Sequence, residues 1–231
     1  TLTAVDSVVL VIDSVNGVKA QTRRLMEVIA MRKTPVIVFI NKMDRDGKNR
    51  FDLLEEIENE LKIQLHPMTM PINSGKDFKG VYDMHKKSLV LFTAGTKAND
   101  EDVLEIKDLN DDILNKKIGE KDANTLREDV ELIDGVYGEL NEEDYLTGKT
   151  APVFFGSAVN NFGVKEMLDT FIRIAPTPRP RHTTTRDIKP EEEKFSGFIF
   201  KIHANLDPKH RDRIAFLRVC SGRFERSKYY H

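Results

Sequence analysis

The chain has 231 residues, of which 39% are hydrophobic and 32% charged, and its formal net charge is −2. Its length suits one large or two modest globular domains, and the near balance of charges gives no indication of a DNA or membrane partner. The single cysteine, Cys220, excludes a disulfide framework and a cysteine-rich metal site. This fits a reducing compartment, and we expect a cytoplasmic protein.

Two apolar runs near the start of the chain predict buried strands, over Ser7–Asp13 and Val36–Ile40. Apolar residues at helical spacing predict amphipathic helices over Val18–Arg32 and about Arg50–Lys62, and a polar loop, Asn41–Asn49, lies between the second strand and the second helix. Strands that alternate with helices in this way predict an α/β fold with a doubly wound parallel sheet.

The middle of the chain breaks this alternation, and we predict an inserted subdomain over residues 71–150. Its pattern predicts strands within Val81–Thr93 and a helix over Asn124–Leu140. Between them, the acidic segment Asn99–Asp112 has the composition of a mobile loop.

The α/β pattern resumes with a predicted strand, Pro152–Gly156, and a helix, Val164–Ile174. Three prolines follow, at positions 176, 178 and 180. Proline at this density stops a helix and stiffens the chain, so we place a domain boundary there. The first domain is then 1–180.

The C-terminal part, 181–231, is predicted to be a linker and the first part of a β-barrel domain. Apolar residues alternate at Phe198, Phe200 and Ile202, and Arg213–Val219 repeats a strand-like pattern. A few strands of this kind need further strands to bury their apolar face.

The loop Asn41-Lys42-Met43-Asp44 carries the clearest chemistry, because it directly follows a predicted buried strand. Guanine presents two adjacent donors, the ring N–H and the exocyclic amine, and the carboxylate of Asp44 can accept both. The stem of Lys42 can pack on the base, and the amide of Asn41 can bond the base and nearby backbone. Turn formation alone also favours Asn and Asp in such a loop. The strand-loop-helix context favours guanine recognition.

A second loop, Gly156-Ser157-Ala158, follows the next predicted core strand. Ligands of parallel α/β sheets lie beyond the carboxyl ends of the strands, so the two loops should meet at one edge. We expect the Ala158 N–H to donate to the guanine carbonyl and Ser157 to brace Asp44. By itself this tripeptide is usually only a turn.

These motifs resemble the GTP-binding domain of the translational GTPases. Asn41-Lys42-Met43-Asp44 resembles the guanine-specificity motif of that family, Ser157-Ala158 its last nucleotide motif, and Val11-Ile12-Asp13 the segment after its second switch. The resemblance implies a domain of the P-loop NTPase type, in which Ser7–Asp13, Val36–Ile40 and Pro152–Gly156 form neighbouring strands.

Within the family, the segments Phe200–Ile202 and Asp207–Arg213 are most similar to release factor 3. Residues 71–82 resemble an insertion that release factor 3 shares with elongation factor G, and Asp207–Arg213 resembles the start of the second domain of release factor 3. This resemblance implies a ribosome-dependent GTPase of translation termination that recycles class I release factors, with the ribosome and those factors as partners. Elongation factor G and the ribosomal protection GTPases are alternatives from the same class.

No phosphate-binding loop, switch threonine or magnesium-binding D-x-x-G segment is convincingly present in these residues. Because the chain also starts at Thr1 rather than Met, we expect a fragment of the C-terminal half of the GTP-binding domain. We expect no catalytic residue, no metal ligand and no tight binding of GTP or GDP, which the intact protein would bind with Mg²⁺. A non-enzymatic interaction module is the alternative from another class.

Overall fold

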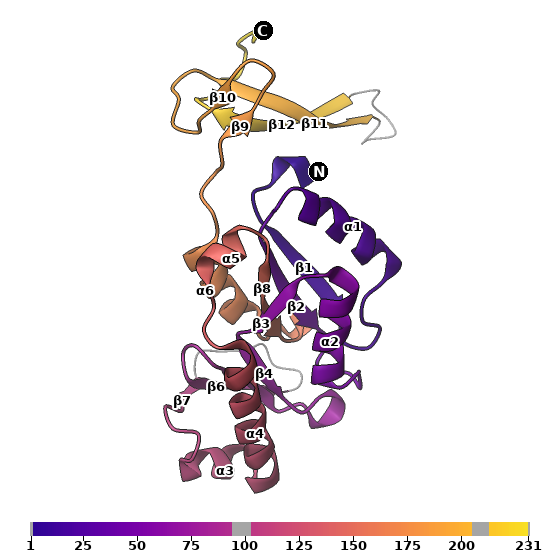
Figure 1. The fold of residues 1–231 in the computed structure, drawn as a ribbon, viewed down its shortest axis with the longest axis vertical. Coiled ribbons are helices and arrows are strands. Elements are labelled where there is room, and N and C mark those ends of the chain that lie inside the picture. Colours follow the sequence, from indigo (N-terminus) through magenta and orange to yellow (C-terminus); the bar gives the residue numbers. More distant parts are fainter. Residues whose placement is uncertain (1, 94–102, 205–212, 231) are drawn as a thin grey trace. The chain divides into compact units, whose positions relative to one another are not determined.

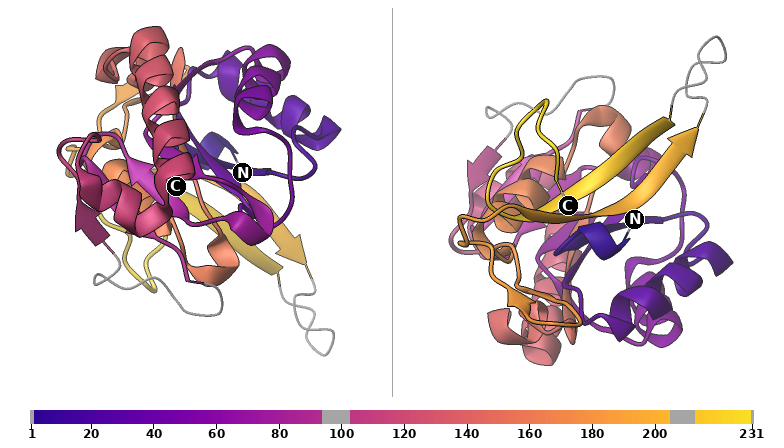
Figure 2. Two further views of the ribbon diagram at one scale, coloured as in Figure 1. Left: turned by 90° about the horizontal axis from the view of Figure 1, so that it is seen from below. Right: turned by 90° about the horizontal axis from the view of Figure 1, so that it is seen from above.

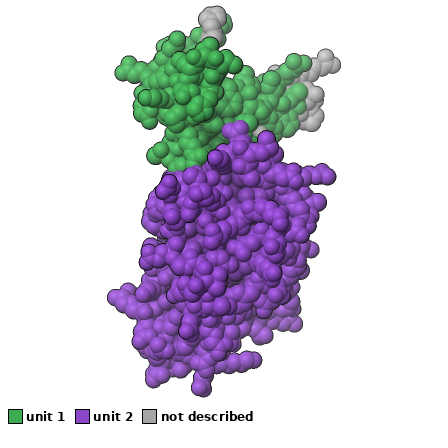
Figure 3. Space-filling view, in the orientation of Figure 1, with its two compact units in different colours: residues 1–6, 176–231 green, residues 7–175 purple. Residues whose placement is uncertain are grey.

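The computed structural model describes residues 2–93, 103–204 and 213–230. The chain divides into two compact units, coloured separately in Figure 3. The larger unit comprises residues 7–175, and the smaller one combines residues 1–6 with residues 176–231.

A four-stranded parallel sheet forms the centre of the larger unit. Its strands are β1 (Val8–Asp13), β2 (Val36–Asn41), β8 (Thr150–Phe155) and β3 (Gln64–Pro67), and they lie in the order β1-β2-β8-β3. The α/β class and the three predicted neighbouring strands are confirmed. The sequence did not predict β3, because four residues that include a glutamine, a histidine and a proline show no apolar pattern.

The register of the sheet brings three strand ends together. Asp13 at the end of β1 is opposite Asn41 at the end of β2, and Ile40 is opposite Phe155 at the end of β8. The loops that follow these strands therefore leave the sheet at the same edge.

Helices cover both faces of this sheet (Figure 1). On one face lie α1 (Ala20–Met31) and α2 (Arg50–Leu61), and on the other lie α5 (Glu142–Leu146) and α6 (Val164–Ile174). Every residue of β2 before Asn41 is buried, as its uninterrupted apolar sequence predicts. On the α6 side, the core consists of Ile37, Phe39, Met68, Tyr145, Phe154, Met167 and Ile174.

A second, antiparallel sheet lies between β3 and β8 in sequence, in the lower part of Figure 1. Its strands follow one another as β4 (Thr69–Ile72), β5 (Gly80–Asp83), β6 (Ser88–Leu91) and β7 (Val103–Glu105), and the helices α3 (Asp112–Ile118) and α4 (Glu120–Tyr137) follow them in the chain.

The predicted strands within Val81–Thr93 and the predicted helix near Asn124 are confirmed as β5, β6 and α4. The predicted loop over Asn99–Asp112 is wrong in part. Residues 103–105 form β7, which pairs with β6, and residues 99–102 lie outside the described part. A three-residue edge strand is too short for its alternation to be recognised in sequence. Throughout the described ranges, no helix combines the length and hydrophobicity that a bilayer crossing requires.

The smaller unit contains a long antiparallel hairpin of β11 (Ser196–Ala204) and β12 (Arg213–Ser221), visible in Figure 2. The alternation at Phe198–Ile202 and the pattern over Arg213–Val219 are confirmed as these strands. Most of the segment that resembles release factor 3, residues 207–212, lies outside the described part.

Asp6 holds the first residues of the chain in this unit. Its carboxylate forms ion pairs with Arg181, at 2.9 Å, and with Arg218, at 2.5 Å. Arg218 also donates to the carbonyl of Ala4 at 2.8 Å. Two arginines on one carboxylate explain why residues 1–6 group with residues 176–231 and not with β1.

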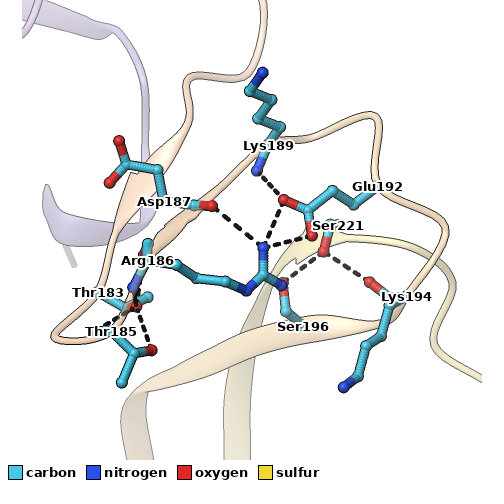
Figure 4. A network of polar contacts seen from close by, with 9 residues as sticks. All are labelled: Thr183, Thr185, Arg186, Asp187, Lys189, Glu192, Lys194, Ser196 and Ser221. Atoms are coloured by element: carbon cyan, nitrogen blue, oxygen red, sulfur yellow. Dashed lines mark hydrogen bonds and ion pairs between the residues drawn. The ribbon is translucent and has the colours of Figure 1, made fainter.

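A network of polar contacts orders the segment between the short strands β9 (Arg181–His182) and β10 (Asp187–Ile188) and the hairpin (Figure 4). Arg186 donates to both carboxylate oxygens of Glu192, at 2.8 and 2.7 Å. The hydroxyls of Ser196 and Ser221 lie 2.6 Å apart, and Ser221 also donates to the carbonyl of Lys194 at 2.8 Å.

Candidate functional site

The loop that follows β2 is fixed by both neighbouring strands. The Ser14 amide, just after β1, donates to the Asn41 carbonyl at 2.9 Å, and the Ser14 hydroxyl donates to the Lys42 carbonyl at 3.0 Å. From the other side, the Met43 amide donates to the Gly156 carbonyl at 3.1 Å. Lys42 has φ of 70°, a left-handed conformation that turns the chain sharply away from the sheet.

The side chain of Asn41 joins the two predicted loops. Its Oδ1 accepts hydrogen bonds from the amides of Lys42 and Ala158, both at 2.8 Å. Because both partners are N–H donors, they fix the orientation of the side-chain amide. The Nδ2 group is then the part of Asn41 with which it can donate to a ligand.

The carboxylate of Asp44 has an unsatisfied acceptor. Its Oδ1 atom is buried and has no hydrogen-bond partner among the described residues. A buried polar atom without a partner costs about 1–3 kcal/mol, and native structures rarely tolerate one without a reason. A ligand that donates a hydrogen bond to this oxygen would remove this cost.

Lys42 is held by a residue that the sequence reasoning did not place in the site. Its Nζ lies 2.6 Å from Oδ2 of Asp13, at the end of β1. Asp13 also accepts from the amides of Val15, at 2.9 Å, and Asn16, at 3.1 Å. The hydrogen bond from Lys42, with smaller contributions from Asn16 and Val15, holds the pKa of Asp13 well below its usual range despite partial burial. The carboxylate therefore stays charged at neutral pH.

Asp13 could have been identified from its place in the sheet. It ends the strand next to β2, in register with Asn41, at the edge where both loops emerge. In the sequence, Val11-Ile12-Asp13 was identified only by its resemblance to a family segment, and no role was predicted for Asp13.

The second loop contains hydrogen bonds that the sequence did not predict. Ser157 is fully buried, and its hydroxyl accepts from Nδ2 of Asn160 at 2.9 Å. Because the hydroxyl accepts in this bond, its O–H can still donate, and the predicted contact with Asp44 stays a prediction. The Ala158 amide bonds Asn41, so donation to a ligand carbonyl would have to share that N–H.

In the described part of the larger unit, one cavity lies next to these loops and another lies away from them. One, of about 390 Å³, lies beside Met43 and is lined by polar residues such as Lys48, Asn49 and Asn73. The other, of about 550 Å³, lies away from the loops, between His66, Met84 and Asp134. The larger cavity contains none of the predicted site residues, so its size does not make it the candidate site.

No group of three or more His, Cys, Asp or Glu side chains with metal-binding geometry occurs within the described ranges. The groups that meet at the sheet edge are the Asp44 carboxylate, with its unpartnered Oδ1, the Asn41 amide, the ion pair of Lys42 with Asp13, and the backbone of two loops. This donor and acceptor set suits a planar base rather than a metal ion.

Two protein-family models match the chain. The model described as "Elongation factor Tu GTP binding domain" matches residues 1–177, and the model described as "Elongation factor G domain 2" matches residues 194–231. The first match covers more than half of the chain and includes both loops described above.

Proposed function

Because the chain belongs to the translational GTPases, the family that carries the elongation factor Tu GTP-binding domain, we propose that its two loops bind the guanine base of GTP or GDP. The observation that carries this proposal is the buried, unpartnered Oδ1 of Asp44. An intact protein of this family is a GTPase. The residues proposed for base recognition are Asn41, Lys42, Asp44, Ser157 and Ala158, with Asp13 added as the partner of Lys42.

The residues of the first loop and Asp13 have separate tasks in this proposal. Asp44 accepts from the ring N–H and the exocyclic amine of guanine, and each charge-assisted hydrogen bond contributes roughly 1.5–3 kcal/mol. The Lys42 stem packs on the base while Asp13 holds its ammonium group. Asn41 donates through Nδ2 to an acceptor of the base, and its oxygen keeps the Ala158 loop in place.

For the intact protein, we propose a ribosome-dependent role in translation termination that recycles class I release factors. Its support is the similarity of residues 200–202 and 207–213 to the start of the second domain of release factor 3, because elongation factor G shares the insertion at residues 71–82. The second candidate is an elongation factor G-like GTPase, which the match of residues 194–231 to elongation factor G domain 2 favours. Release of a labelled class I factor from terminated ribosomes, driven by GTP and the intact protein, separates them. Translocation without factor release would contradict the termination role.

The 231-residue chain by itself is proposed to be inactive as an enzyme. Phosphate and magnesium contacts anchor a nucleotide, and the base contacts select it. GTP or GDP with Mg²⁺ is the proposed ligand of the intact protein, in the cytoplasm. Calorimetry of this chain with GDP and Mg²⁺ should detect no tight binding, and a sub-micromolar dissociation constant would contradict the proposal.

Base recognition itself can be tested on this chain by NMR, which detects weak binding. Titration with GMP should shift the amide signals of Asn41–Asp44 and Ser157–Ala158. AMP offers no pair of adjacent donors to Asp44 and should shift them much less. Equal shifts with both nucleotides, or none with GMP at millimolar concentration (on the order of −4 kcal/mol of binding free energy), would contradict guanine recognition and favour a non-enzymatic interaction module.

A further inference from the structure

The two guanine-binding loops are bonded to each other. The Met43 amide donates to the Gly156 carbonyl, and the Ala158 amide donates to Asn41. A displacement of either loop therefore changes the position of the other, and any element that contacts both can fix their geometry.

The segment between β3 and β8 contacts the first loop through Gly75. The Gly75 amide donates to the Met43 carbonyl at 2.8 Å, one residue before Asp44. Gly75 has φ of +65°, and a Cβ at this position would lie 1.8 Å from Oδ1 of Asp46 and 3.1 Å from its backbone nitrogen. The contact therefore depends on a residue without a side chain.

The same segment contacts the second loop through a cluster of three rings. Phe162 is 1% exposed, and its backbone closes the loop by exchanging two hydrogen bonds with Ser157, at 3.0 and 2.9 Å. Phe78 and Phe92 pack edge-on against its ring, with centroid distances of 5.5 and 5.3 Å, and lie 5.1 Å from each other. Edge-to-face packing of this kind is favourable and directional.

Further contacts from this segment reach the strand and helix next to the loops. The hydroxyl of Thr69, in β4, is fully buried and accepts from the amide of Phe155 at 3.0 Å, directly before Gly156. Asp129, in α4, forms an ion pair with Arg50, the first residue of the helix that follows the Asn41–Asp44 loop. The segment is thus attached on both sides of the site.

We infer that the inserted segment is a structural part of the guanine site, with Gly75, Phe78 and Phe92 as positioning residues. None of them lies in either of the two loops. They set the distance between the Asp44 carboxylate and the Ala158 loop, through Met43 in one case and Phe162 in the other. This role rests on the proposed function, because it assigns the fixed geometry to recognition of the base.

The test uses Phe78→Ala and Phe92→Ala in the 231-residue chain, with two separate readouts. The first is hydrogen exchange of the Ser157 and Phe162 amides, which should become at least about tenfold faster. Amides in the middle of β2 should change by less than about twofold. The second readout is the affinity for GMP, which should fall by at least about fivefold. A tenfold change corresponds to about 1.4 kcal/mol.

Leu114→Ala is the matched control, because it truncates a fully buried side chain of the same inserted segment in α3. Its loop amides should exchange as in the wild type. Equal acceleration in this control would overturn the positioning role, since any loosening of the segment would then suffice. Unchanged loop exchange in folded Phe78→Ala and Phe92→Ala would overturn it as well.

Gly75→Ala provides a test without loss of apolar volume. The added Cβ should displace Asp46, shift the Met43 and Asp44 signals, and weaken GMP binding at least about threefold (close to 0.7 kcal/mol). Wild-type signals and affinity in this variant would overturn the role of Gly75. A wild-type chain without guanine preference would instead contradict the proposed function, whatever the exchange rates show.

Discussion

The two loops at the carboxyl edge of the sheet are held in place by different means. The Asn41–Asp44 loop depends on side chains, because Asn41, Lys42 and Ser14 each make a hydrogen bond through a side-chain atom. The Gly156–Ala158 loop is held by backbone hydrogen bonds, by the buried ring of Phe162 and by hydrogen bonds with the side chains of Asn41 and Asn160. We therefore expect the chemical identity of side chains to decide the function of the first loop, and the space available for a side chain to limit changes in the second.

The largest effect should follow from Asp44→Asn, which changes chemistry without changing volume. An amide can donate to the carbonyl that xanthine has in place of the guanine amine, and can still accept from the ring N–H. Facing guanine, it would leave polar groups unpaired at roughly 1–3 kcal/mol each. The variant should therefore prefer XMP where the wild type prefers GMP, as NMR titrations with both nucleotides would measure.

Asp52→Asn is a suitable control for this change, because Asp52 is exposed in the first turn of α2 and outside the loop. It should retain guanine preference. If Asp44→Asn also keeps its preference for GMP with unchanged affinity, Asp44 is not the specificity carboxylate and the proposed site is wrong.

A related contrast, between local sequence patterns and contacts that form only in the folded chain, separates what the sequence could predict from what it could not. The run Val36–Ile40 predicted β2, and the identities of Asn41, Lys42 and Asp44 predicted a site, because a strand pattern and a chemical motif are both local. The sequence did not predict the partner of Ser157 or the role of Asp13. Both depend on which residues the strand register and the turns bring together. Nothing in the sequence around Asn160 or Asp13 indicates that the fold places them beside Ser157 and Lys42.

The second-largest effect should come from Gly156→Ala, because the second loop has no room for a side chain at this position. The substitution should destabilise the fold. A Cβ at this position would lie 2.3 Å from the carbonyl oxygen of Phe162 and 2.8 Å from the ring of Phe39. Both neighbours are fixed in the core, so the chain must shift, and overpacking of this kind typically costs about 1–3 kcal/mol. Urea unfolding of the 231-residue chain would measure the loss.

Gly135→Ala is the matched control for this substitution. Gly135 lies within α4, and a Cβ there would have no atom within 4 Å. It should be neutral or stabilise the protein by up to about 1 kcal/mol, because alanine favours the helix. Equal stability of the two variants would show that the second loop tolerates a side chain and is not limited by space.

The smallest effect should come from Asp13→Asn, which tests whether the first loop needs a charge beside Lys42. The amide oxygen can still accept from Val15 and Asn16, so the turn should persist. The ion pair is partly exposed, with 40% of the Lys42 side chain accessible, and screened pairs contribute only about 0.2–1 kcal/mol. We expect an affinity loss of about twofold to fivefold at pH 7, equal for GMP and IMP, because in the proposed site the Lys42 stem would pack on any purine.

The direction of the pH dependence follows from the lowered pKa of Asp13. A carboxylate with a depressed pKa contributes above its unfolded value, about 3.9, and loses the contribution as the pH falls through its lower folded value. The difference between wild type and Asp13→Asn should therefore be the same at pH 6 and pH 8. IMP lacks the exocyclic amine of GMP. A loss of affinity for GMP but not for IMP would therefore mean that Asp13 recognises this amine, which we propose for Asp44. It would contradict the proposal that Asp13 acts only by holding Lys42.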